Sequence, residues 1–370
     1  MKHELWIDRW KGVLILLVVI GHAVGTGSTI SSGHTAQWLN DARMVIYSFH
    51  MPAFFILSGF CYKMFNNEGT IVSWSNFLRN RAFRLLLPYF IFGVLSVVIF
   101  ALVHGYANWW QPIVSLLHAG SWPNGEGFRC NSVLWFLPCM FSVLCFAKVV
   151  SSVLGKVLKN AAFTLRMIML LFLMLVMFGL YHWENWGIHL HFLPYGVDMI
   201  PWYFGYFACG VLIKEVVTKY RGRVISIKLN GSIFTGLSLT LLAAHWYIAH
   251  DNYHHSLDPH FGGGYYSRVA LTVIATMITA LVAIAIRWRW LESVGLASMG
   301  IMLIHKFPLV FIQEKVFTKI PWLTPQTSSL KIALVSALLV AAFSMVTAYF
   351  ATLILRHYAP WMIGERRKNG

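Results

Sequence analysis

The stretch Trp6-Ile7-Asp8-Arg9-Trp10-Lys11-Gly12 leads into the apolar run Val13–Ile20 and then Gly21-His22. An apolar run with cations at its start is typical of a membrane helix. Lys11 and His22 lie eleven residues apart, about three helical turns or ~16 Å, and therefore on one face. Ionisable groups within a bilayer usually face a cavity and have a function there. A histidine hydrogen-bonded to a neighbouring helix is the alternative interpretation of His22.

The composition is that of a polytopic membrane protein. Of 370 residues, 58% are hydrophobic and 11% are charged, whereas soluble domains have about 25% charged residues. We expect one all-α transmembrane domain over 1–370, with a basic cytoplasmic end at 357–370, and we interpret the first apolar run as a retained span. Hydropathy predicts about ten transmembrane helices, at 12–27, 43–62, 84–104, 131–150, 164–182, 199–214, 231–249, 268–286, 294–313 and 331–355.

The formal net charge of +16 does not require a nucleic-acid partner. Most lysines and arginines fall in segments that are cytoplasmic if the N-terminus is inside, as the positive-inside rule describes. The same rule places both termini in the cytoplasm. The five cysteines lack the spacing of a disulfide framework, and the His- and Asp-rich loop at 250–267 lacks a metal-binding motif, so no metal is expected.

The second span contains Phe49-His50-Met51-Pro52 and Ser58-Gly59. Pro52 removes a backbone donor, which is tolerated where a neighbour or cavity water satisfies the freed carbonyl. Gly59 lets another helix come close. A kinked packing helix would explain Pro52 and Gly59 but not His50, a second intramembrane imidazole. His305, near the end of Ser298–Lys306, is a third.

Two further features carry binding hypotheses. Arg81 and Arg84 share a helical face at the cytoplasmic membrane edge and suit phosphate groups. Contact with lipid head groups is the alternative, which the arginine pair alone favours. Trp135 suits stacking on a sugar ring, although an interfacial aromatic belt explains tryptophans equally well.

Together these segments resemble the acyltransferase-3 family of integral-membrane O-acyltransferases, closest to its fucose-4-O-acetylase-like branch. The resemblance spans residues 6 to about 310. Lys11 stands where the family commonly has Arg, which keeps the charge but loses the bidentate fork. The matching pieces, in family order, are Asp8-x2-Lys11-Gly12 with Lys11-x10-His22, Phe49-His50-Met51-Pro52 with Phe55-x2-Ser58-Gly59-Phe60, Arg81-x2-Arg84 before Pro88-Tyr89, Trp135-Phe136, Tyr203–Gly210 and Ser298–His305.

The resemblance implies transfer of an acyl group, usually acetyl, from cytoplasmic acetyl-CoA to a hydroxyl of a surface glycan or lipid-linked saccharide. It implies residence in the bacterial inner (cytoplasmic) membrane, among membrane lipids, and leaves homo-oligomerisation open. Direct transfer and an acyl-enzyme route both remain open.

The site residues take roles from this chemistry. A sugar hydroxyl needs a base near neutral pKa, so we expect His22 to be the general base or a transient acyl carrier. Arg81 and Arg84 are candidates to hold CoA. Lys11 would bind a phosphate, guide the pantetheine or pair with Asp8. His50, Ser58 and His305 are unranked donors for the thioester oxyanion. Trp135 and Asp8 are the candidate substrate-binding residues.

Two rival functions follow from the same residues. A transporter or flippase for a lipid-linked sugar or acyl substrate would use buried His and Lys as a proton relay. The lack of a visible internal repeat weakens this interpretation. A non-catalytic membrane sensor or assembly partner would tolerate replacement of His22, Lys11 and Arg81.

Overall fold

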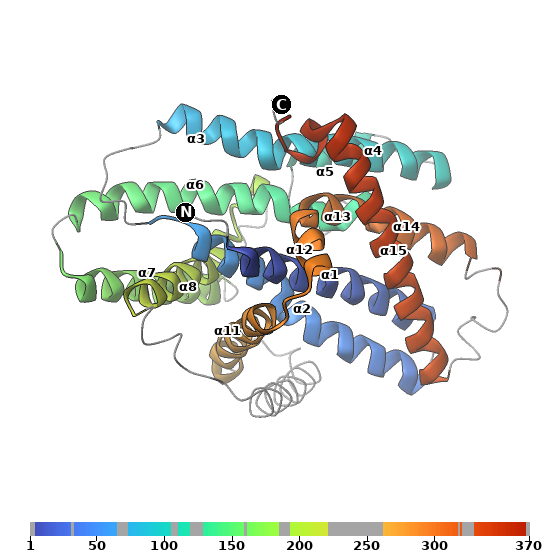
Figure 1. The fold of residues 1–370 in the computed structure, drawn as a ribbon, viewed down its shortest axis with the longest axis horizontal. Coiled ribbons are helices and arrows are strands. Elements are labelled where there is room, and N and C mark those ends of the chain that lie inside the picture. The colour runs from blue at the N-terminus through green and yellow to red at the C-terminus, as the bar shows by residue number, and fades with distance from the viewer. Residues whose placement is uncertain are drawn as a thin grey trace. The chain divides into compact units, whose positions relative to one another are not determined.

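The computed structural model describes residues 4–30, 33–64, 73–104, 110–118, 129–158, 161–184, 193–220, 262–316, 319 and 329–367 (Figure 1). Every regular element within these residues is a helix, and none is a strand. This confirms the prediction of an all-α protein.

The described residues contain seven helices that are long and apolar enough to cross a membrane, or eight if a bent pair counts as one span. They confirm a polytopic membrane protein. The first predicted span, 12–27, lies within helix α1, and the predicted span 231–249 lies outside the described residues. The cytoplasmic placement of both termini stays a prediction. The seven are Gln37–Cys61, Trp74–Ile99, Asn131–Val157, Phe163–His182, Pro194–Lys219, Arg268–Ala285 and Leu330–Tyr358, and the bent pair is Arg289–Leu296 with Ser298–Phe311.

The chain divides into two compact units. The first unit comprises Met1–Phe54 and Lys228–Leu355, and the second comprises Phe55–Ile227 and Arg356–Gly370. Each unit is therefore built from segments that are distant in sequence. The expectation of a single functional domain over 1–370 stays a prediction.

In the first unit, α1 packs against α11, α12 and α13. The backbones of α1 and α12 approach so closely that a Cβ atom at Gly295 would overlap the carbonyl oxygen of Asp8. Small residues allow such backbone approach in membrane helices. The unit's elements are α1 (Leu5–Ile30), α2 (Gly33–Cys61, up to Phe54), α11 (Gly262–Ala285), α12 (Arg289–Leu296), α13 (Ser298–Ile304), α14 (Lys306–Phe311), the π-turn η4 (Ile312–Val316) and α15 (Leu330–Tyr358, up to Leu355).

In the second unit, α8 packs against α6 and α7 and also receives the end of α2. A Cβ atom at Gly59 would overlap the carbonyl oxygen of Phe207, so the close helix approach predicted for Ser58-Gly59 is confirmed. The unit's elements are α3 (Trp74–Arg81), the π-turn η1 (Ala82–Leu86), α4 (Leu87–His104), α5 (Trp110–His118), η2 (Arg129–Trp135), α6 (Phe136–Val157), α7 (Phe163–Glu184), η3 (Pro194–Gly196), α8 (Ile200–Lys219) and η7 (Pro360–Ile363).

The π-turn η1 follows from Pro88, which has no N–H to give to the carbonyl of Arg84, four residues earlier. The chain closes over this position from its other end. Gly364 has a φ of 70°, and a Cβ atom there would meet the main chain of Arg84. A left-handed conformation and a close approach both favour glycine at this place.

Candidate active site

The first unit brings three histidines and a tyrosine together. Gly21, directly before His22, faces Ile46 and Tyr47 of α2, and a Cβ atom there would lie 3.0 Å from each side chain. Since no side chain separates the two helices at this level, His22 lies directly against Tyr47. The Tyr47 hydroxyl is 2.7 Å from Nδ1 of His22, and the two ring centroids are 5.4 Å apart.

His50 and His305 flank this pair. The His305 ring centroid lies 5.4 Å from that of His22, and the His50 ring centroid lies 4.9 Å from that of Tyr47. His50 is 4% exposed and His305 is fully buried, while His22 and Tyr47 remain partly exposed. The structure thus gathers into one cluster three residues that sequence analysis could only name separately. We call His22, Tyr47, His50 and His305 the histidine cluster.

The hydrogen bonds of His50 and His305 define which nitrogen of each ring carries the proton. Nδ1 of His50 lies 2.8 Å from the carbonyl oxygen of Ile46. Nδ1 of His305 lies 2.9 Å from that of Ile301 and 3.0 Å from that of Met302. A carbonyl oxygen only accepts, so both rings donate from Nδ1, and in the neutral form Nε2 is an acceptor. Donation from Nε2 to an oxyanion, as sequence analysis proposed, would require the charged imidazolium.

His305 is the residue between α13 and α14, which together form the segment Ser298–Phe311 of the bent pair. The 62° bend of that pair lies before this segment, where Arg289–Leu296 ends. Pro308 interrupts the hydrogen bonding near His305 because it has no N–H for the carbonyl of Ile304. The Ser344 hydroxyl of α15 donates to the carbonyl oxygen of His305 at 2.5 Å. Broken membrane helices are tolerated where the freed backbone lies within protein.

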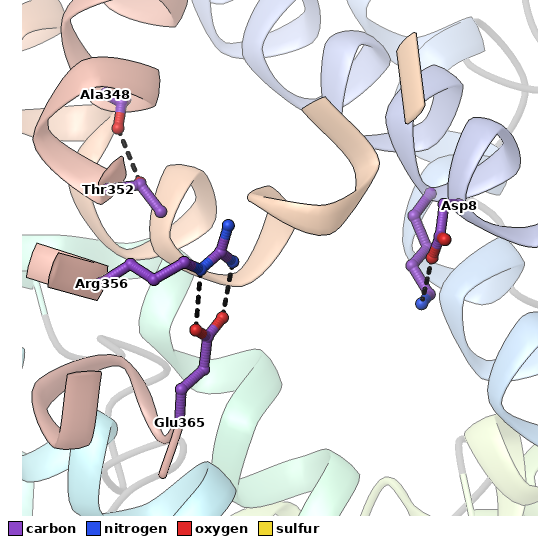
Figure 2. Close-up of polar contacts among 6 residues, drawn as sticks. Asp8, Ala348, Thr352, Arg356 and Glu365 are labelled. Carbon is purple, nitrogen blue, oxygen red and sulfur yellow. Dashed lines mark hydrogen bonds and ion pairs between the residues drawn. The ribbon is translucent and has the colours of Figure 1, made fainter. Parts of the chain in front are cut away.

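Lys11 and Asp8 form an ion pair at the start of α1 (Figure 2). Nζ of Lys11 lies 3.1 Å from Oδ1 of Asp8, whose side chain is 2% exposed, whereas that of Lys11 is 36% exposed. Of the three roles that sequence analysis left open for Lys11, pairing with Asp8 is the one present in this structure. The backbone of Asp8 also packs closely against Gly295 of α12. The ion pair and this contact give Asp8 a structural role, as an alternative to the substrate-binding role predicted from the sequence.

Arg81 and Arg84 belong to the second unit, where other cations join them. The Arg81 guanidinium and the Lys148 ammonium both lie over the Phe77 ring, at 5.5 and 5.9 Å from its centroid. Arg366 lies over Phe83 at 5.7 Å and donates to Asn80 at 2.6 Å. Arg84 is exposed and Arg81 partly exposed. Sequence analysis missed Lys148 and Arg366 because they come from α6 and from the segment after η7, far from α3 along the chain.

Ser58 and Trp135 also lie in the second unit. Trp135 is partly exposed, and its ring centroid lies 5.4 Å from that of Tyr203. Tyr203 in turn stacks on Phe55 at 4.3 Å. Tyr203 and Phe55 are buried, so Trp135 is the ring of these three that is open to the apolar face of a sugar. Ser58 is partly exposed near the end of α2.

No group of three or more His, Cys, Asp or Glu among the described residues is placed to hold a metal ion. The residue that sequence analysis overlooked in the histidine cluster is Tyr47. Its signal was its position three residues before His50, which places both on one face of α2. In an aromatic-rich span that spacing alone does not distinguish it from a packing residue.

One family model and two curated relatives match the chain. A family model described as an acyltransferase domain, acyltransferase 3, matches residues 4–357. The nodulation protein NolL of Mesorhizobium japonicum is 38% identical over 89 residues, and that of Sinorhizobium fredii is 35% identical over 89 residues. Each match covers 24% of this chain and 22% of the relative, so the chain matches about a fifth of their length. No solved structure matches.

Proposed function

Because the chain belongs to the acyltransferase-3 family, we propose that this membrane acyltransferase moves an acetyl group from cytoplasmic acetyl-CoA to a hydroxyl of a surface glycan or lipid-linked saccharide. The observation that carries the proposal is the histidine cluster. It combines three imidazoles and a phenol within helices of a membrane protein. Acyl transfer to a hydroxyl needs a base that titrates near neutral pH, and imidazole is the side chain that does so.

The donor would be held by the cations of the second unit. CoA carries a 3′-phosphate and a pyrophosphate, and arginine binds phosphate oxygens in a bidentate manner. Arg81 and Arg84 are supported in this role by Lys148 and Arg366, which lie over the neighbouring aromatic rings. Four cations within the second unit suit three phosphates better than the arginine pair alone.

The acceptor would be held by Trp135, a partly exposed ring supported from behind by the buried Tyr203 and suited to a saccharide. The two curated relatives are named nodulation proteins and come from bacteria. We propose on this ground that the protein resides in a bacterial inner membrane.

The test uses purified protein in nanodiscs, labelled acetyl-CoA and a panel of glycan acceptors. Wild-type protein should transfer label to an acceptor hydroxyl, and His22→Ala should lose at least about a hundredfold in rate, since loss of either a general base or an oxyanion donor has an effect of that size. His357→Ala is the matched control, because His357 is exposed at the end of α15. Wild-type protein that consumes no acetyl-CoA with any acceptor, or a fully active His22→Ala, would overturn the proposal.

A further inference from the structure

The hydrogen bond between Tyr47 and His22 has a preferred polarity. A phenol is a stronger hydrogen-bond donor than a neutral imidazole N–H, and an imidazole nitrogen is a stronger acceptor than a phenol oxygen. Within the described part of the chain, His22 Nδ1 is also the one hydrogen-bond partner of the Tyr47 hydroxyl. Tyr47 therefore donates to Nδ1. A neutral imidazole has one acceptor nitrogen, so Nε2 of His22 carries the proton and is a donor.

His305 has the opposite polarity. Its Nδ1 proton is held by the carbonyl oxygens of Ile301 and Met302, which leaves a lone pair on Nε2. That nitrogen is fully buried and has no hydrogen-bond partner among the described residues. A buried polar atom without a partner destabilises a protein by about 1–3 kcal/mol. Such atoms are rare in native structures and require a specific reason, a catalytic role among them.

The two rings are neighbours, with centroids 5.4 Å apart. The His22 ring carries an N–H on Nε2, and the His305 ring carries an acceptor that has no partner in the described part of the chain. His50 does not share this relation, because its ring lies against Tyr47. Two cations, Lys306 and Arg43, lie near enough to His22 to act on it electrostatically. Their positive charge suits an oxyanion that accepts a hydrogen bond from His22.

We propose that the two histidines divide the work of acyl transfer: His305 is the general base, His22 is the oxyanion donor, and Tyr47 is the positioning residue that sets the His22 tautomer. The proposal rests on the acyltransferase function and moves the base role from His22 to His305. Nε2 of His305 takes the proton of the acceptor hydroxyl as its oxygen bonds to the thioester carbonyl carbon. The carbonyl oxygen, now an oxyanion, accepts the N–H of His22.

Collapse of this intermediate breaks the carbon–sulfur bond. The thiolate of CoA leaves and takes the proton from Nε2 of His305. The products are the acetyl ester and the free thiol of CoA, and both histidines return to their starting protonation. No acyl-histidine is formed on this route, because His22 has its lone pair on Nδ1, where Tyr47 donates to it.

Glutamine substitutions separate the two roles, because a glutamine amide donates a hydrogen bond but is not a base at neutral pH. His22→Gln should retain at least tenfold more activity than His22→Ala. His305→Gln should be as inactive as His305→Ala. Thermal unfolding of each variant in nanodiscs identifies any that fail to fold. The reverse pattern, an active His305→Gln with an inactive His22→Gln, would overturn the assignment.

The tautomer can be measured without any activity. In ¹⁵N-histidine-labelled protein, the chemical shifts of the two ring nitrogens distinguish a protonated Nε2 from a protonated Nδ1, and His22→Gln identifies the signal. Wild-type His22 should be protonated on Nε2, and Tyr47→Phe should shift the population toward the other tautomer. A wild-type His22 protonated on Nδ1 would contradict the proposal even if the protein were inactive. An inactive wild type with the expected tautomer would instead count against the acyltransferase chemistry.

Discussion

The hydroxyl of Thr272 lies 3.1 Å from the carbonyl oxygen of Ser48, to which it donates. This carbonyl is the one that Pro52 leaves without its helical donor, because proline has no N–H. Thr272 comes from α11 and Ser48 from α2, within the first unit. The carbonyl that Pro52 leaves free therefore lies between Tyr47 and His50 along α2, and a neighbouring helix satisfies it.

Removal of this donor should destabilise the protein. We expect Thr272→Val to lower the free energy of unfolding by about 1 kcal/mol, as for other hydrogen bonds in membrane proteins. The matched control is Thr276→Val on the same helix. The Thr276 hydroxyl donates at 2.7 Å to the carbonyl of Thr272, which already lies within the helical ladder of α11. Denaturation in mixed micelles would measure both.

A double mutant tests whether Thr272 stabilises the protein through the Ser48 carbonyl that Pro52 leaves free. In Pro52→Ala the restored amide can donate to Ser48, so the Thr272→Val substitution should have a smaller effect in that background. Equal effects of Thr272→Val in both backgrounds would show that the hydroxyl stabilises the fold in another way.

Gly295 is expected to be intolerant of any side chain. A Cβ atom there would overlap the carbonyl oxygen of Asp8, so Gly295→Ala should force α12 away from α1 and lower stability by about 2 kcal/mol or more. Gly155→Ala and Gly179→Ala are the controls, since among the described residues nothing beyond the glycine's own helix lies within 4 Å of a Cβ atom at either position. Both should be neutral or mildly stabilising, because alanine is the better helix former. Thermal unfolding of the three variants would rank them.

Substitutions in the Lys11–Asp8 ion pair should distinguish a structural role of Lys11 from a role in acetyl transfer. Lys11→Met should leave the buried carboxylate of Asp8 without its cation and destabilise the protein by about 2 kcal/mol, less than for a fully buried pair because Lys11 is 36% exposed. Combining it with Asp8→Asn should restore stability. If Lys11 only pairs with Asp8, the double variant should also regain acetyl transfer. A stable but inactive double variant would instead indicate that Lys11 contacts the donor.

Arg81 and Arg84 should act on donor binding rather than on chemistry. Each change to Ala should raise the KM for acetyl-CoA about tenfold or more, since a charge-assisted hydrogen bond contributes roughly 1.5–3 kcal/mol. If the two arginines bind the 3′-phosphate, the same substitutions should raise the KM for acetyl-dephospho-CoA, which lacks that phosphate, by a smaller factor. Arg79→Ala is the control on the same helix, because Arg79 is exposed and is not among the four cations proposed to bind CoA. An unchanged KM in the Arg81 and Arg84 variants would favour lipid head groups as their partners.

An ion pair between Arg356 and Glu365 connects the segment after α15 to the end of that helix (Figure 2). Nε and Nη2 of Arg356 donate to the two carboxylate oxygens of Glu365 at 2.7 and 2.6 Å. Because both side chains are about a third exposed, loss of the pair should lower stability by less than about 1 kcal/mol. Glu365→Gln should nevertheless make the bond after Arg366 more accessible to trypsin. Cleavage no faster than in the wild type would show that Gly364 and its contact with Arg84 suffice to hold the segment.

The membrane class, the helical fold and the candidate histidines follow from local features of the sequence. Long apolar runs leave the backbone no alternative to helices in lipid, and charged residues at their ends place the boundaries. Pro52 and Gly59 likewise predict a freed carbonyl and a close helix contact from the chemistry of a single residue. These inferences need no knowledge of which helices are neighbours.

Tertiary structure alone decided the hydrogen-bond polarity of the site. Whether His22 is a donor or an acceptor depends on Tyr47, and whether His305 is a base depends on which of its nitrogens meets a carbonyl at the break between α13 and α14. Such relations join residues as far apart as 22 and 305, and sequence spacing along one helix carries no information about them. An imidazole has the same composition in either tautomer, so its role is set by its neighbours in space.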